Sequence, residues 1–130
     1  MGNAGVEARL SDHPFLNIEI LTQNLPTRDA ALALLLRFKP TLVDEVSEIE
    51  RSLTRNDLET VRFHTHRIRS GSLYLGIEGV GLPATQLEEL LENQAPRDDI
   101  LAAWSVLRTA CRRFLSHDRA GLESLIGGLS

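Results

Sequence analysis

The sequence has little cysteine, no long apolar run and no signal peptide. Its single cysteine, Cys111, excludes an internal disulfide bond and suits a reducing compartment, where we expect a buried, unreactive thiol. No apolar run approaches the roughly 20 residues of a membrane-spanning helix. Residues 1–5 lack the basic and apolar regions of a signal peptide. We therefore expect a cytoplasmic protein that does not enter a membrane.

An excess of positive charge is also missing. The 130 residues include 14 Lys and Arg against 18 Asp and Glu, for a net charge of −4. A nucleic-acid-binding surface needs a basic field to displace condensed counterions. The composition therefore disfavours nucleic acid as a partner, and the length suits one domain with one modest core.

Strand signals are absent too, because no segment alternates polar and apolar residues with β-branched enrichment. Apolar residues instead recur at helical spacing in four long segments, about 27–53, 57–75, 83–92 and 99–115. A shorter amphipathic segment, 15–25, precedes them, and a last short helix or turn covers 121–126. We predict an all-α fold, an antiparallel up-down four-helix bundle with a short N-terminal capping helix.

The predicted bundle covers residues 13–126, with a flexible segment at 1–12 and a tail at 127–130. Thr27 and either Asn56 or Asp57 are expected to cap two of the long helices. Pro40 should kink the first long helix near Arg37 to Pro40 without breaking it.

Glycines at 76, 79 and 81 follow the second long segment. No Lys-Ser/Thr pair follows them and no strand precedes them, so a helix stop is a better interpretation than a phosphate-binding loop. Pro83 would then lie in the first turn of the next helix. The acidic residues of that helix, Glu88, Glu89 and Glu92, are most simply its solvated face.

A second apolar strip of Leu32, Leu36 and Val43 lies beside the main stripe of the first long helix. The simpler interpretation is that it packs beneath the N-terminal helix. The alternative is a docking surface for a partner protein.

His66 is the residue around which the chemistry can be argued. Its helix buries a stripe that includes Leu58, Val61 and Ile68, and at about 100° per residue His66 points about 130° away from that stripe. Arg62 and Arg69 lie one turn before and after it on the same side. The pattern therefore predicts an exposed imidazole between two guanidinium groups on a rigid helix.

Several kinds of site are excluded or disfavoured. His64 and His66 diverge by about 200° on a helix, so they cannot share a metal ion, and no cysteine pattern accompanies them. His64 lies nearer the core and is interpreted as structural. The sequence lacks paired Glu-x-x-His motifs, a strained nucleophile turn and the glycine-rich loops of ATP-binding domains. We expect no metal, no cofactor and no ATP-dependent kinase activity.

An exposed neutral imidazole can attack an electrophilic phosphorus atom, and a neighbouring cation can stabilise the charge on the transferred group. Ser70 and the small residues after it would let another protein approach the ring. The alternative is an incidental surface histidine in an arginine-rich chain, and spacing alone does not decide between the two.

The motif around His66 resembles the histidine-containing phosphotransfer (HPt) domain of bacterial and fungal phosphorelays. The matching residues are His66, the cation Arg69, Gly76 ten residues after the histidine, the Leu87-Glu88 pair, and upstream Phe38, Leu53 and Asp57. The resemblance covers about residues 15–117. Arg69 stands where the family has lysine, and Ser70 stands where it has glycine. His64 fits less well as the acceptor, because Ile68 would then take the glycine position.

The resemblance implies that His66 accepts a phosphoryl group from a receiver-domain aspartate and passes it to a second receiver. It also implies that Arg69 stabilises that group. We predict Arg62, Ser70, Leu73 and Gly76 as binding residues beside them. Mg²⁺ would come only from the partner receiver.

Two other functions stay open. One is the phosphoacceptor domain of a chemotaxis-type histidine kinase, and the other is a helical interaction module that is never phosphorylated. We expect a monomer, because the polar faces of the helices are continuous.

Overall fold

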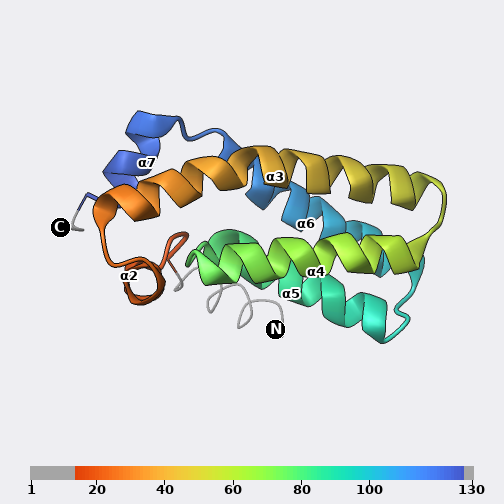
Figure 1. Ribbon diagram of the computed structural model, residues 1–130. Coiled ribbons are helices and arrows are strands. Elements are labelled where there is room, and N and C mark those ends of the chain that lie inside the picture. Colours follow the sequence, from red (N-terminus) through yellow and green to blue (C-terminus); the bar gives the residue numbers. More distant parts are fainter. Residues whose placement is uncertain (1–13, 128–130) are drawn as a thin grey trace.

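The computed structural model describes residues 14–127, which form helices and no strands (Figure 1). The four long helices are α3 (Arg28–Thr54), α4 (Leu58–Tyr74), α5 (Glu78–Glu92) and α6 (Arg97–Leu115), and the two short ones are α2 (Ile18–Asn24) and α7 (Arg119–Leu125). The predicted all-α class is confirmed for this part of the chain. The predicted flexible segment 1–12 and most of the tail 127–130 lie outside the described residues.

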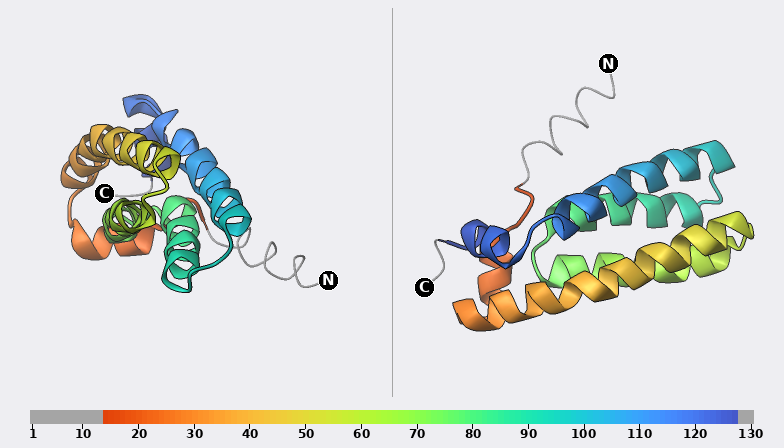
Figure 2. Two further views of the ribbon diagram at one scale, coloured as in Figure 1. Left: turned by 90° about the vertical axis from the view of Figure 1, so that its right-hand side faces the viewer. Right: turned by 90° about the horizontal axis from the view of Figure 1, so that it is seen from above.

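The four long helices lie side by side around a common core (Figures 1 and 2). The α4 helix packs against both α3 and α5, while α6 packs against α5 and α3. The short helices α2 and α7 lie at the same end of this assembly (Figure 1). Their position leaves the middle of α4 uncovered along its outer face.

Capping side chains begin the helices where the sequence predicts them. The Thr27 hydroxyl accepts a hydrogen bond from the Ala30 N–H, and the Asp57 carboxylate accepts one from the Thr60 N–H. Each bond satisfies a backbone donor that the first turn leaves free. The α3 helix continues past Pro40 to Thr54, so the proline does not break it.

Apolar side chains from all four long helices form one continuous core. Its fully buried members include Leu35, Leu42, Ile68, Leu87 and Phe114. Cys111 is buried in the same core, and burial raises the pKa of its thiol to about 12. A thiol with that pKa is unreactive at neutral pH, as predicted.

The second apolar strip does not form one surface. Leu32 is buried and Leu36 is partly buried against the core, whereas Val43 is about half exposed. This division favours the packing interpretation for the first two residues.

The helix boundary predicted in the glycine-rich stretch, residues 76–81, was wrong. Only Gly76 ends a helix, because α5 already begins at Glu78 and continues through Gly79, Gly81 and Pro83. Pro83 therefore lies a full turn inside the helix, not in its first turn. The glycines within α5 allow close packing, since a Cβ at Gly81 would collide with the Leu73 side chain.

Gly76→Ala is expected to destabilise the fold by about 2 kcal/mol or more, seen as a lower midpoint in thermal or urea unfolding. Gly76 has a φ of +73°, and a Cβ there would lie 2.5 Å from the Asn17 carbonyl oxygen, which is backbone and has little room to move. Gly121→Ala, within α7, is the control and should change the midpoint little. Equal stability of the two variants would contradict this account of the turn.

Candidate functional site

His66 lies in the middle of α4 with its side chain 56% exposed. On the opposite side of the helix Val61 and Ile68 are fully buried, as predicted, whereas Leu58 is only partly buried. The exposed position of the imidazole follows from the helical period alone. The partner of its Nδ1 does not, because that partner comes from another helix.

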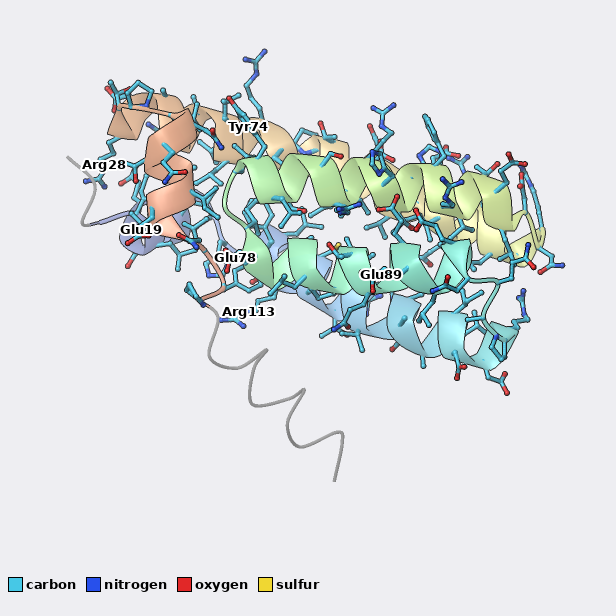
Figure 3. The ribbon with its side chains drawn as sticks, turned by 90° about the horizontal axis from the view of Figure 1, so that it is seen from below. Glu19, Arg28, Tyr74, Glu78, Glu89 and Arg113 are labelled. Carbon is cyan, nitrogen blue, oxygen red and sulfur yellow. The ribbon has the colours of Figure 1, made fainter. Side chains whose placement is uncertain are left out.

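Glu88 of α5 is the main partner of His66. The imidazole Nδ1 lies 2.8 Å from Glu88 Oε2, and Arg69 Nη1 donates to Glu88 Oε1, also at 2.8 Å. The Glu88 side chain is only 5% exposed, so its interpretation as a solvated residue was wrong. It lies next to the core residue Leu87 on the side of α5 that packs against α4, whereas Glu89 and Glu92 are exposed as predicted. Figure 3 shows α4 and α5 side by side, with Glu89 labelled on α5.

Glu88 stays ionised in this setting. Burial by itself would raise the pKa of its carboxyl, but hydrogen bonds from Arg69 and His66 outweigh burial and hold the pKa below its usual range. An ionised carboxylate only accepts hydrogen bonds, so His66 Nδ1 must carry the proton that it shares with Glu88. In the neutral form of the imidazole, the lone pair is then on the other ring nitrogen, Nε2, which faces the exposed side of the ring.

The surroundings of Nε2 are polar and open. The Ser70 hydroxyl, one helical turn on, lies 3.4 Å from this nitrogen. Arg62 lies 3.8 Å from Glu92, and both side chains are about half exposed, so this ion pair is weak. The site lies in a surface hollow of about 410 Å³. The hollow is lined by Glu59, Arg62, Phe63, His66, Arg69, Glu88 and Glu92. With three carboxylates and two guanidinium groups, the hollow itself offers no net positive charge.

The remaining residues of the predicted motif lie outside this hollow. Leu73 is two turns beyond His66 on a similar face of α4 and packs over Gly81. Gly76 is buried in the turn that ends α4. The structure thus brings His66, Arg62, Arg69 and Ser70 together, and places Leu73 and Gly76 in the packing beside and below them.

A second cluster on α4 mirrors the first. His64 Nδ1 lies 2.6 Å from Glu45 Oε2, and Arg67 Nε lies 2.9 Å from Glu45 Oε1. Here the carboxylate comes from α3, and the His64 side chain is only 16% exposed. This cluster joins α3 to α4 as the Glu88 cluster joins α4 to α5. It fits the structural role predicted for His64 and makes it a natural control for His66.

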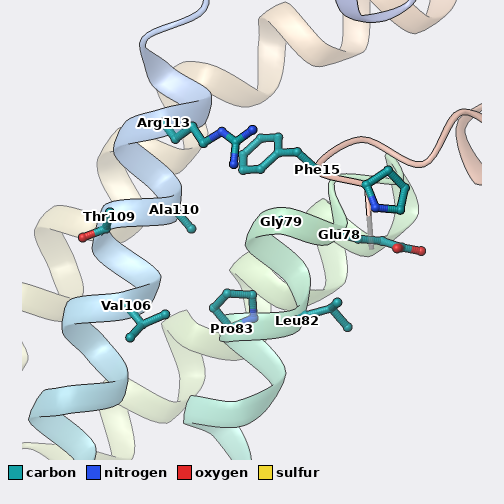
Figure 4. Close-up of a pocket in the computed structure, with 10 residues that line it drawn as sticks. Phe15, Glu78, Gly79, Leu82, Pro83, Val106, Thr109, Ala110 and Arg113 are labelled. Atoms are coloured by element: carbon teal, nitrogen blue, oxygen red, sulfur yellow. The ribbon is translucent and has the colours of Figure 1, made fainter. Parts of the chain in front are cut away.

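A separate cavity of about 540 Å³ lies between α5 and α6, beside Phe15 (Figure 4). The Arg113 guanidinium stacks on the Phe15 ring at 4.3 Å from its centroid. None of the groups around His66 lines this cavity.

Within residues 14–127, no group of three or more His, Cys, Asp or Glu side chains is placed to hold a metal ion. No helix in that range has the length and apolar character that crossing a membrane requires.

Comparisons with known proteins found a matching family model and a solved structure with a similar fold. The family model for the Hpt domain matches residues 33–117, well over half of the chain. The fold is similar to the crystal structure of the HPT domain from the Hpt sensor hybrid histidine kinase of Shewanella, with a TM-score of 0.69 and 20% sequence identity over 89% of this chain and 97% of that one. No curated protein matched the chain.

Proposed function

The chain belongs to the Hpt domain family of phosphotransfer modules in two-component signalling, and from this premise we propose that His66 carries the phosphoryl group. In this proposal the group arrives from the aspartyl phosphate of a receiver domain and leaves to the aspartate of a second receiver. The observation that supports it best is the buried Glu88 carboxylate, which holds His66 Nδ1 at 2.8 Å and leaves Nε2 as the exposed nucleophile.

The proposed transfer is a displacement at the phosphorus atom, with His66 Nε2 as the nucleophile and the receiver aspartate as the leaving group. The Nε2 lone pair attacks phosphorus, and the bond from phosphorus to the aspartate oxygen breaks with its electron pair remaining on the carboxylate. The Nδ1 proton stays between the ring and Glu88 throughout. Because the ring becomes cationic as Nε2 bonds to phosphorus, the Glu88 carboxylate stabilises the transition state more than the free ring. In the reverse step a receiver carboxylate attacks the same phosphorus atom, and Nε2 recovers its lone pair.

Arg69 and Arg62 are proposed to face the equatorial oxygens of the transferred group. The bond of Arg69 to Glu88 places its guanidinium beside the ring, and its side chain is 39% exposed and thus within reach of a partner. The three carboxylates of the hollow outnumber these two guanidinium groups, so the hollow offers no net positive charge to the phosphoryl group. We therefore expect the Mg²⁺ of the receiver to supply the remaining neutralisation, with no metal or cofactor bound by this chain.

The proposed docking face for the receiver is the exposed side of α4. Phe63 and Tyr74 are both more than half exposed, and a shallow hollow of about 230 Å³ lies next to Tyr74 over Gly71 and Phe38. Figure 3 shows Tyr74 labelled at the end of α4 nearest α2. His66 and Ser70 lie between these two aromatic side chains in the sequence of the helix. Aromatic side chains are enriched in protein interfaces relative to the rest of the surface.

We also propose an arrangement of the helices, an oligomeric state and a cellular location for the protein. They are an up-down antiparallel bundle of α3 to α6 capped by α2, a monomeric state that keeps His66 open to its partners, and a location in the cytoplasm. A chemotaxis-type kinase acceptor would use the same histidine, and a longer parent chain with an ATP-binding domain would favour it.

The experiment that tests the carrier function is incubation with a phosphorylated receiver and Mg²⁺, followed by mass spectrometry of the phosphorylated peptide. We expect a phosphate on His66 that is labile in acid and stable in base. A second, unphosphorylated receiver should then remove it. No transfer from any receiver, combined with transfer from an ATP-dependent kinase domain, would favour the chemotaxis-type alternative. If neither donor transfers a phosphoryl group, the result would favour the alternative of a helical interaction module that is never phosphorylated.

Arg69→Ala is expected to slow transfer about tenfold without unfolding the domain, since a change of about 1.4 kcal/mol in a barrier is tenfold in rate. Arg69→Lys should keep most of the activity, because a cation remains beside the ring. Rapid-quench measurement of transfer from a phosphorylated receiver checks both variants at physiological salt. Arg67→Ala, which removes the equivalent arginine of the Glu45 cluster, is the matched control. If Arg69→Ala transfers as fast as the parent, Arg69 has no special role.

A further inference from the structure

Ser70 is the nearest hydroxyl to the proposed nucleophile. It lies one turn beyond His66 on the exposed side of α4, with its Oγ 3.4 Å from His66 Nε2. Within the described residues its side chain makes no other hydrogen bond. The residue is exposed, so its hydroxyl is not part of the buried core of α4.

Whether Ser70 donates or accepts in this contact depends on the proton of the other ring nitrogen, Nδ1. In the neutral ring that acts as the nucleophile, Nδ1 carries the proton shared with ionised Glu88, so Nε2 accepts a hydrogen bond. The Ser70 hydroxyl is therefore the donor, and it points along the side of the ring where phosphorus would bond. At 3.4 Å the bond is long and weak, so an incoming phosphoryl group can displace it.

Phosphorylation changes what the hydroxyl can bind. Once phosphorus occupies the Nε2 lone pair, Ser70 loses that acceptor and gains up to three charged phosphoryl oxygens in its place. A hydroxyl donates more strongly to a charged oxygen than to a neutral nitrogen. The other acceptor within reach of a helical serine is the backbone carbonyl one turn earlier, which is neutral and already bonded in the helix.

Resting on the carrier function proposed above, we propose that Ser70 is a phosphoryl-binding residue whose hydroxyl donates to the phosphoryl group on His66. The hydrogen bond stabilises phosphohistidine relative to the free ring. It therefore moves the transfer equilibrium with a receiver toward this chain and lowers the rate at which water removes the phosphoryl group. Ser70 thus favours retention of the phosphoryl group over its rapid onward release.

The test compares Ser70→Ala, Ser70→Gly and Ser70→Thr with the parent chain. Each protein is phosphorylated by a phosphorylated receiver and Mg²⁺, separated from the receiver, and followed for loss of phosphohistidine by hydrolysis. The level of phosphohistidine at equilibrium with the receiver is measured in parallel. Ser47→Ala, at an exposed serine in α3 that makes no side-chain hydrogen bond, is the matched control. Circular dichroism confirms that each variant is folded.

Ser70→Ala and Ser70→Gly are expected to shorten the phosphohistidine lifetime by about three- to tenfold, the range that one net hydrogen bond contributes. Ser70→Thr, which keeps the hydroxyl, and Ser47→Ala should resemble the parent. The equilibrium level should fall by a similar factor in the Ala and Gly variants only.

Two results would overturn the assignment of Ser70. One is a Ser70→Ala lifetime equal to that of the parent. The other is a lifetime that changes with side-chain size from Gly to Ala to Thr, which would indicate a steric effect and no hydrogen bond. Failure of the carrier function is distinguishable, because the parent chain itself would then acquire no phosphate on His66, and the role of Ser70 would fail with it.

Discussion

His66→Gln is expected to abolish phosphoryl acceptance, with no phosphohistidine detected after incubation with a phosphorylated receiver. The glutamine side chain can still donate a hydrogen bond to Glu88, so the fold and the Glu88 carboxylate keep a partner. An amide nitrogen has no basic lone pair, however, and cannot replace Nε2 as the nucleophile. Phosphate-affinity electrophoresis and mass spectrometry of the α4 peptide measure the result.

His64→Gln is the matched control for this prediction. His64 has the same kind of contact, with its Nδ1 2.6 Å from a buried carboxylate and an arginine three residues on. Its side chain is only 16% exposed, compared with 56% for His66. We expect His64→Gln to accept the phosphoryl group at a rate close to that of the parent. If His64→Gln loses phosphoryl acceptance and His66→Gln keeps it, the phosphoacceptor is His64 and not His66.

Glu88→Ala is expected to slow transfer about 100-fold, the scale that misplacement of a reacting group by about 1 Å can cost. Without the carboxylate, the proton is free to move to Nε2, the ring is free to rotate, and its developing positive charge loses a buried partner. Glu88→Gln should be milder, about tenfold, because its amide oxygen still accepts from Nδ1 but carries no charge. Rapid-quench kinetics with a phosphorylated receiver gives the rates.

Glu45→Ala is the control for the Glu88 variants. It removes the buried carboxylate of the second cluster, which joins α3 to α4 and does not touch His66. We expect a loss of stability of about 1–3 kcal/mol in urea unfolding and a transfer rate within a few-fold of the parent. If Glu45→Ala and Glu88→Ala slow transfer equally, the effect of Glu88 is one of stability, and its proposed influence on the ring is wrong.

The helical class and the exposure of His66 followed from the sequence because both depend on local period. Apolar residues spaced at three and four positions identify the buried side of α4, and any residue about 130° away must face outward. Helix beginnings at Thr27 and at Asn56 or Asp57 were predicted for the same reason, since a cap bonds to a backbone group only three residues away, and the structure has Thr27 and Asp57.

The glycine-rich turn was predicted less well. Glycine and proline usually end helices, and this preference placed the start of the third long segment at Pro83 instead of Glu78. In the structure, Gly79 and Gly81 serve the approach of α5 to Phe15 and Leu73. A helix boundary that is set by contacts between distant segments leaves only an ambiguous signal in the local sequence.

By itself the sequence determined a helical chain with an imidazole held outward between Arg62 and Arg69, because these features repeat with the period of one helix. Only the tertiary structure decided the chemistry of that imidazole. The sequence of its own helix predicts a solvated Glu88. In the structure Glu88 is the buried partner of His66, because the side of α5 that carries Glu88 packs against α4. That contact, whose two residues lie 22 positions apart in the chain, places the shared proton on Nδ1, and the hydrogen bonds from Arg69 and His66 together keep Glu88 ionised.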